Sequence, residues 1–97
     1  MAATDTHYLA LIHKDDTSGY GVSFPDVPGV IAVAETLDEA IAEAAAALEF
    51  AFEDWDGALP APRTLDVLRL DPEFQRDSAD AVIAAIKPSH GYYAAAE

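Results

Sequence analysis

The chain has 97 residues and a mass of 10.3 kDa, which fits one small domain and is too short for two. Its 18 Asp and Glu outnumber its 5 Lys and Arg, and the net charge of −13 has the wrong sign for a protein that binds a polyanion. The sequence contains no cysteine, which excludes disulfides, thiolate zinc sites and a cysteine nucleophile. No apolar run is long enough to span a bilayer, and residues 1–5 do not resemble a secretory signal, so we predict a cytoplasmic protein without membrane contact.

The first third of the chain predicts a three-stranded antiparallel meander. Three runs rich in aromatic and aliphatic residues are separated by short turns, which is typical of neighbouring antiparallel strands. The runs cover residues 7–13, 20–24 and 30–34. Alternation in the second run places Tyr20, Val22 and Phe24 on one face of the sheet. Pro28 and Gly29 predict a type II turn before the third run, because glycine adopts the positive φ that this turn requires.

A long helix is predicted to begin at Thr36 and to end at Gly57. Thr36 and Glu39 have the spacing of a capping box, and glycine is typical of the residue that follows a helix. Apolar residues recur every three or four positions, so we expect one apolar stripe to pack against the sheet. The stripe comprises Leu37, Ile41, Ala44, Ala45, Leu48, Phe52 and Trp55.

The remaining sequence predicts shorter elements. An extended proline-containing loop at 59–62 precedes a short helix within 64–70, capped by Thr64, and a polar segment at 71–79 that we expect to be irregular. Residues 81–86 favour a fourth strand, although their alanines leave a helix open. The order predicts an α+β domain over residues 1–90, in which an antiparallel sheet carries the long helix on one face, followed by a tail at 91–97.

Three ordered segments resemble the HicB antitoxin family. They are Tyr20-Gly-Val-Ser-Phe-Pro-Asp-Val-Pro-Gly29, Glu35-Thr-Leu-Asp-Glu-Ala40 and Leu59-Pro-Ala-Pro-Arg-Thr-Leu65, and the resemblance covers roughly residues 7–70. It implies a partial RNase H-like fold without nuclease chemistry. Members of this family neutralise HicA, a small basic mRNA-cleaving toxin with a fold like that of double-stranded-RNA-binding domains. The implied partner is therefore a basic protein.

Many members of the family also carry a C-terminal DNA-binding domain. Only 11 residues follow Ile86, so we expect no such domain and no direct binding of nucleic acid by this chain. Two functions remain open. One is an antitoxin module that binds a HicA-type toxin, and the other is a stand-alone, self-associating HicB-like domain without a toxin partner. A homodimer or tetramer is expected because small sheets leave their edges open.

The face of the long helix opposite the apolar stripe is the candidate partner-binding site. Phe50 lies among carboxylates there, an arrangement that suits an aromatic anchor for a basic partner or for a second copy of the chain. The alternative is a solvated face with one exposed aromatic side chain. The predicted site comprises Glu39, Glu43, Phe50, Glu53 and Asp54.

No enzymatic activity, cofactor or metal site is predicted. Two-metal chemistry needs converging carboxylates, whereas Asp15, Asp16 and Asp26 fall in predicted turns, where Asp side chains form local hydrogen bonds. The three histidines share no spacing typical of metal ligands: His7, His13 and His90. An enzyme that uses acidic residues from distant parts of the sequence is a weak alternative. Four basic residues are spread along the C-terminal half without forming a basic cluster: Arg63, Arg69, Arg76 and Lys87. They are available to pair with the acidic residues of the helix or, at most, to form a small patch.

Overall fold

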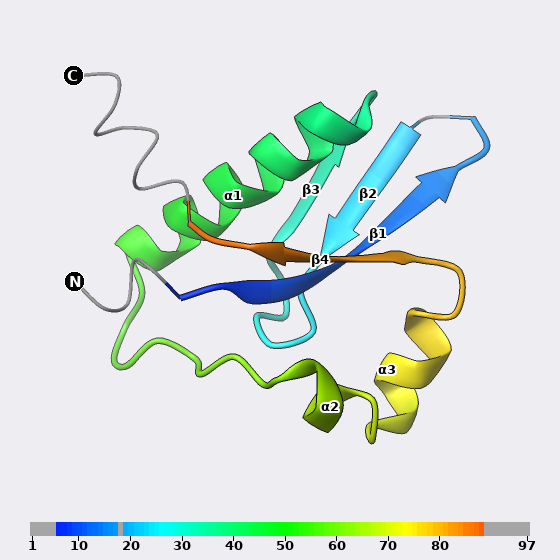
Figure 1. Ribbon diagram of the computed structural model, residues 1–97. Coiled ribbons are helices and arrows are strands. Elements are labelled where there is room, and N and C mark those ends of the chain that lie inside the picture. The colour runs from blue at the N-terminus through cyan, green and yellow to red at the C-terminus, as the bar shows by residue number, and fades with distance from the viewer. Residues whose placement is uncertain (1–5, 18, 89–97) are drawn as a thin grey trace.

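The computed structural model describes residues 6–17 and 19–88, and the predictions for His90 and for the tail at 91–97 lie outside these residues. Figure 1 shows seven elements in this part of the chain. They are β1 (Tyr8–Asp15), β2 (Gly19–Ser23), β3 (Ile31–Ala34), α1 (Leu37–Glu53), α2 (Leu65–Leu68), α3 (Pro72–Asp77) and β4 (Val82–Ile86). The predicted α+β order is confirmed, and the run at 81–86 forms a strand.

The four strands form one antiparallel sheet with the order β3-β2-β1-β4. The first three strands are the predicted meander, and β4 returns to pair with β1 (Figure 1). Val22 lies opposite Ile12 in β1 and Ala32 in β3, and Ile12 lies opposite Val82 in β4. Residues directly opposite each other share a face of the sheet. Strands β3 and β4 are therefore the two edges.

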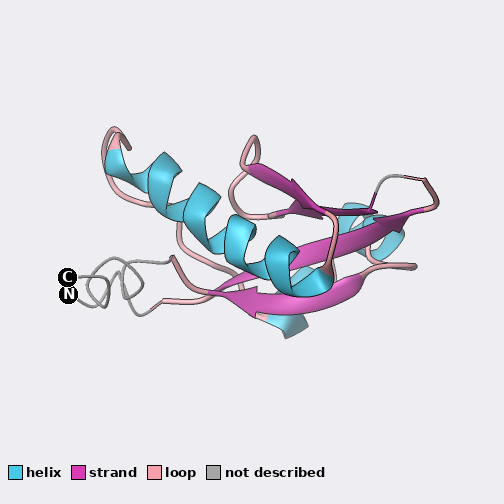
Figure 2. Ribbon diagram, turned by 90° about the horizontal axis from the view of Figure 1, so that it is seen from above, coloured by secondary structure: helices cyan, strands magenta, loops and turns pink. Residues whose placement is uncertain are grey.

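Helix α1 covers one face of the sheet, and Figure 2, seen from above, places α1 in front of the strands. Ala40, Ala44 and Leu48 are fully buried against this face, with Ala10, Ile12, Val22 and Ala32 among their sheet partners. The predicted stripe is confirmed at Ala44 and Leu48 but wrong at its N-terminal end, because Leu37 and Ile41 are each 39% exposed. Small alanine side chains let the helix approach the strands closely. Ala40 is therefore buried against the sheet at the position where Leu37 and Ile41 were expected.

Helices α2 and α3 pack under the other face. Leu11 of β1, Leu68 of α2 and Phe74 of α3 form a second buried cluster there. The expectation that 71–79 is irregular is wrong, because residues 72–77 form α3. The Asp71 carboxylate accepts a hydrogen bond from the Glu73 backbone N–H at 2.9 Å, and Pro72 begins the helix with a favourable φ. The Asp-Pro pair therefore starts a helix instead of forming an isolated turn.

Helix α1 begins as predicted and ends earlier than predicted. The Thr36 hydroxyl accepts a hydrogen bond from the Glu39 backbone N–H at 3.1 Å. The helix ends at Glu53, since Asp54 leaves the helical conformation with φ −107° and ψ 18°, and Gly57 lies in the following loop. With 17 residues, α1 is the longest helix of the described chain, and no helix among these residues could cross a membrane.

Two successive turns connect β2 to β3. The Val27 backbone N–H donates to the Phe24 carbonyl and the Val30 N–H donates to the Val27 carbonyl, both at 3.2 Å. Gly29 has a φ of +95°, as the predicted type II turn requires. The side chain of Val27 is fully buried between the two turns. This double turn positions Asp26, which begins the site described next.

Candidate protein-binding surfaces

Asp26 holds the double turn against the loop that follows α1. Its carboxylate accepts hydrogen bonds from the Arg63 backbone N–H and from Arg63 Nε–H, each at 2.6 Å. The Asp26 side chain is only 8% exposed, so its carboxylate is shielded from solvent, whereas the Arg63 side chain is 39% exposed. The expectation that Asp26 serves local hydrogen bonds in its turn is wrong, because its partner lies 37 residues away. The proline-containing loop is thereby tied to the turn.

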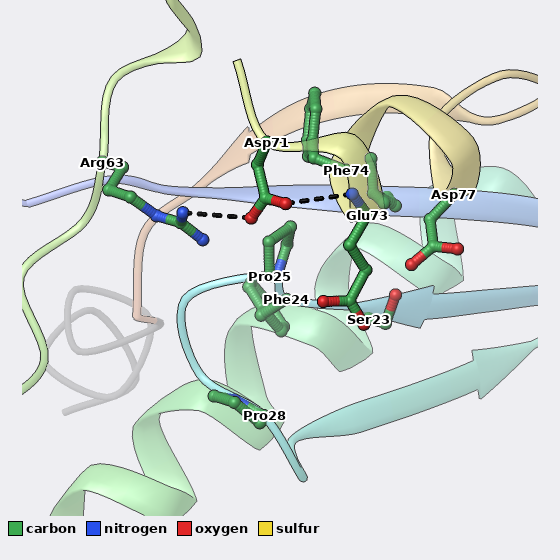
Figure 3. Close-up of a pocket in the computed structure, with 10 residues that line it drawn as sticks. Ser23, Phe24, Pro25, Pro28, Arg63, Asp71, Glu73, Phe74 and Asp77 are labelled. Carbon is green, nitrogen blue, oxygen red and sulfur yellow. Dashed lines mark hydrogen bonds and ion pairs between the residues drawn. The ribbon is translucent and has the colours of Figure 1, made fainter. Parts of the chain in front are cut away.

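Arg63 also reaches helix α3. Its Nη1 donates to the Asp71 carboxylate at 3.3 Å (Figure 3), so Arg63 pairs with Asp26 and Asp71 and not with the acidic residues of the long helix, one of the two possibilities that the sequence left open. The hydrogen bond to Asp26 raises the pKa of Arg63 above its ordinary value. The hydrogen bond from the Glu73 backbone N–H, with the nearby Arg63 cation, lowers the pKa of Asp71. One network of charged side chains therefore joins the double turn, the loop and α3.

A cleft of about 270 Å³ opens beside this network (Figure 3). Its apolar lining includes Leu11, Phe24 and Phe74, and its acidic lining includes Glu73 and Asp77. Arg63 and Asp71 line it too, and the charge of Arg63 is balanced by its ion pairs with Asp26 and Asp71. In Figure 3 the side chains of both acidic residues extend toward Ser23. The volume lies below the ~300–1,000 Å³ of typical small-molecule pockets. The cleft therefore fits a protein side chain better than a drug-sized ligand.

The chemistry of the cleft suits a basic side chain. Lys and Arg bury their methylene groups on apolar surface while the cation binds a carboxylate, which matches the apolar lining beside Glu73 and Asp77. Both acidic residues are exposed and lie on α3, a helix that no sequence pattern predicted, and therefore no sequence pattern indicated the cleft. Among residues 6–17 and 19–88, no three His, Asp or Glu side chains come together in a geometry that would hold a metal ion.

The structure divides the partner-binding residues predicted on the long helix. All five side chains are exposed, and that of Phe50 is 70% exposed. Glu43 and Phe50 line a shallow groove between α1 and β3, whereas Glu39, Glu53 and Asp54 do not line it. The apolar members of this groove include two residues of β3, Ile31 and Val33.

Sequence reasoning missed the exposure of β3. Ile31 and Val33 are 67% and 74% exposed, although the run at 30–34 is apolar throughout. Ala32 and Ala34 pack toward α1, so the residues that alternate with them point to the other face of the sheet. The alternation of small and large residues in this run could have indicated the exposed face, because Ala32 and Ala34 lie on the covered face and Ile31 and Val33 on the other.

Comparison with known proteins places this fold in a family. A family model described as the HicB-like antitoxin of bacterial toxin–antitoxin systems matches residues 8–92. The chain belongs to this HicB-like antitoxin family. The resemblance found in the three sequence segments is therefore confirmed.

Solved structures of HicB antitoxins share the fold. The Burkholderia pseudomallei antitoxin HicB is 34% identical with a TM-score of 0.67, over 84% of this chain and 62% of that one. The N-terminal domain of the same antitoxin is 30% identical with a TM-score of 0.63, over 84% of this chain and 96% of that domain. The antitoxin HicB3 is 19% identical with a TM-score of 0.66, over 88% of this chain and 65% of that one. At this identity the likeness supports only the fold. No curated protein matches the chain.

Proposed function

We propose that this HicB-like chain is a non-catalytic antitoxin module that binds and neutralises a small basic HicA-type mRNA interferase in the cytoplasm. The observation that carries the proposal is the match to the HicB-like antitoxin family over residues 8–92. A further structure with this fold, 17% identical with a TM-score of 0.59, is that of a HicA3 and HicB3 toxin–antitoxin complex. Binding of a toxin by a domain of this shape therefore has a precedent.

Charge supports the choice of a basic partner. A net charge of −13 on 97 residues attracts a basic protein from a distance and accelerates encounter. A toxin that cleaves mRNA presents cations to the phosphates of its substrate, and an acidic protein competes for the same cations. Neutralisation in this proposal means occupying the RNA-binding face of the toxin, which requires no catalytic group on this chain.

The cleft beside Asp71 is the proposed anchor point for the toxin. A Lys or Arg side chain of the toxin enters it, packs on Phe24 and Phe74, and pairs with Glu73 and Asp77. Three acidic residues lie outside the β3 groove: Glu39 and Glu53 on α1, and Asp54 directly after its end. They attract the toxin without forming the anchor. In this proposal, α3 contacts the toxin directly, and the acidic residues of α1 attract it electrostatically from a distance.

The alternative is a stand-alone HicB-like domain that self-associates and has no toxin partner. The exposed apolar side chains of Ile31, Val33 and Phe50 favour self-association. They do not exclude a toxin, because the cleft and these side chains are separate surfaces. The two functions differ in whether a basic protein binds at all.

The proposal predicts that a gene for a small basic HicA-type protein lies beside the gene of this chain. The test is binding of that gene's product, measured by calorimetry at micromolar concentration. We expect a tight complex with the wild-type chain and at least about a tenfold loss of affinity for Glu73→Lys/Asp77→Lys. The matched control, Asp16→Lys/Asp56→Lys, makes the same change of charge at exposed positions away from the cleft. A third variant, Glu39→Lys/Glu53→Lys, is expected to slow association more than it speeds dissociation. No complex with the wild-type chain would reject the antitoxin function, and equal losses in the cleft variant and its control would reject the cleft.

A further inference from the structure

One end of the cleft presents carboxylates that lack a close partner within the chain. Among residues 6–17 and 19–88, no group pairs with the Glu73 carboxylate, and the Asp77 carboxylate has only the exposed Arg76 Nε, at 3.8 Å. The Ser23 hydroxyl lies between these two side chains and the sheet (Figure 3), and it too has no hydrogen bond within the described residues. This acidic end of the cleft therefore offers three acceptors to a donor from outside the chain.

The other end of the cleft already holds a guanidinium. Arg63 donates from Nε to Asp26 at 2.6 Å and from Nη1 to Asp71 at 3.3 Å, so its planar group bridges two carboxylates from different segments. Both Arg63 and Asp71 line the cleft. The chain itself thus shows how a guanidinium is held at this place, and it supplies no equivalent group for Glu73 and Asp77.

The geometry of the acidic end favours a planar cation with several donors. Glu73 and Asp77 lie one turn apart on the same face of α3, which places their Cβ atoms ~5–6 Å from each other. Both side chains extend toward Ser23 of β2, so acceptors from two elements surround one space (Figure 3). A guanidinium carries five N–H donors in a fixed plane and reaches all three acceptors at once. An ammonium carries three donors around a single nitrogen and is a point charge.

The apolar lining of the cleft favours the same group. Leu11, Phe24 and Phe74 form much of the surface that an entering side chain would contact. A guanidinium is more weakly hydrated than an ammonium, so its transfer onto such a surface costs less free energy. The methylene groups of an arginine pack on the apolar residues while its head reaches the carboxylates. Charge, geometry and lining therefore all match one side chain.

We propose that the cleft is an arginine anchor, which binds the guanidinium of an arginine of the toxin in preference to the ammonium of a lysine. This inference rests on the proposed toxin binding for the source of the arginine, and it adds the chemical group that is recognised. The guanidinium donates to the carboxylates of Glu73 and Asp77 and to Ser23 Oγ. Ser23 is the specificity-determining residue, because a lysine that pairs with both carboxylates leaves the hydroxyl without a donor.

The site is tested with small probes added to the isotope-labelled full chain and followed by NMR. The probes are the N-acetyl methylamides of arginine, lysine and citrulline. The arginine probe should shift the amide signals of Ser23, Phe74 and Asp77 with a Kd on the order of 1 mM. The lysine probe should bind about tenfold more weakly, as the loss of one charge-assisted hydrogen bond predicts. Citrulline has the shape of arginine without its charge and should not bind measurably. Equal affinities for arginine and lysine, or shifts confined to other surfaces, overturn the proposal.

Variants assign the preference to the cleft. Glu73→Gln/Asp77→Asn preserves the size of both side chains and should weaken binding of the arginine probe at least about tenfold. The matched control, Glu35→Gln/Asp16→Asn, removes the same charge at exposed positions away from the cleft and should change the affinity less than about twofold. Ser23→Ala should weaken binding of arginine and leave that of lysine unchanged. Circular dichroism verifies that each variant folds. Equal losses in the cleft variant and its control, or a preference that survives Ser23→Ala, contradict the assignment.

The toxin separates this inference from the proposed function. Each exposed arginine of the HicA-type protein is changed to lysine, which preserves its charge, and binding to this chain is measured by calorimetry. One such change should weaken the complex about tenfold, and it should have no further effect on binding to Glu73→Gln/Asp77→Asn. A tight complex that no arginine-to-lysine change weakens overturns the arginine anchor and leaves the antitoxin function standing. No complex at all, while the probes still show the preference, rejects the antitoxin function and supports the cleft as an arginine site.

Discussion

The carboxylate of Asp26 binds both the backbone N–H and the Nε–H of Arg63, each at 2.6 Å, and joins two loops 37 residues apart. This pair connects the double turn after β2 to the loop after α1, and through Asp71 to helix α3. The cleft with its acidic lining lies beside this network (Figure 3). Arg63 and Asp71 of the network also line the cleft, so the ion pairs set both the position of the cleft and part of its wall.

Asp26→Ala should destabilise the fold by about 2 kcal/mol, because it leaves two donors of Arg63 without their acceptor in a shielded position. Urea unfolding at pH 7 measures the loss. Arg76→Ala is the control, since Arg76 and Asp77 form an exposed pair at 3.8 Å, and its removal should cost less than about 0.5 kcal/mol. Equal effects would contradict the role given to Asp26.

Asp71 should make stability depend on pH in the acidic range. Its pKa is lower in the folded chain than its ordinary value of 3.8, so its contribution is complete above pH 3.8 and is lost as the pH falls through the lowered value. Asp71→Asn keeps a good helix-capping side chain and removes this titration. The difference in free energy of unfolding between wild type and Asp71→Asn should therefore narrow below about pH 4. A difference that stays constant from pH 6 to 2 would mean that Asp71 is not responsible.

Two glycines of β2 should respond oppositely to alanine. Gly19 has a φ of +124°, and a Cβ there would lie 2.5 Å from the Ala34 carbonyl oxygen, so Gly19→Ala should cost about 2 kcal/mol or more. Gly21 has open space around the same position, and Gly21→Ala should be neutral or stabilise the strand by up to about 1 kcal/mol. Thermal unfolding of the two variants compares them directly. The assigned strand geometry is wrong if Gly21→Ala is the more damaging change.

Salt should separate toxin binding from self-association. Toxin binding through Glu73 and Asp77 joins opposite charges and should weaken as ionic strength rises, because the screening length falls to about 8 Å at 0.15 M salt. Self-association through the exposed apolar side chains of Ile31, Val33 and Phe50 joins two acidic chains and should strengthen over the same range. Titrations at low and high salt measure both affinities. The same salt dependence for both reactions would indicate that they share one surface.

Local patterns in the sequence predicted the parts of the fold that depend on neighbouring residues. The strand alternation, the Thr36 cap and the Pro28-Gly29 turn each involve residues within a few positions of one another, and all are present. The end of α1 was predicted too late, because a glycine marks the preferred stop of a helix and an earlier residue can end it first. Helix α3 was not predicted because Phe74 is its single buried residue, and one apolar residue among polar ones gives no helical periodicity.

The candidate site could be predicted only in part, because its components come from distant segments. Phe50 and Glu43 were selected from one helix, but their neighbours Ile31 and Val33 become visible only when β3 is placed at the sheet edge. The pairing of Asp26 with Arg63 likewise depends on the path of the loop between α1 and α2, which no local pattern specifies.

The central claim is that this HicB-like chain neutralises a basic RNA-cleaving toxin, and RNA cleavage measures this directly. The purified HicA-type protein that is expected to be encoded by the neighbouring gene is incubated with a labelled RNA and increasing amounts of the wild-type chain. Cleavage should stop near an equimolar ratio of the two proteins, and Glu73→Lys/Asp77→Lys should require about tenfold more protein to stop it. Undiminished cleavage in the presence of excess wild-type chain would contradict it.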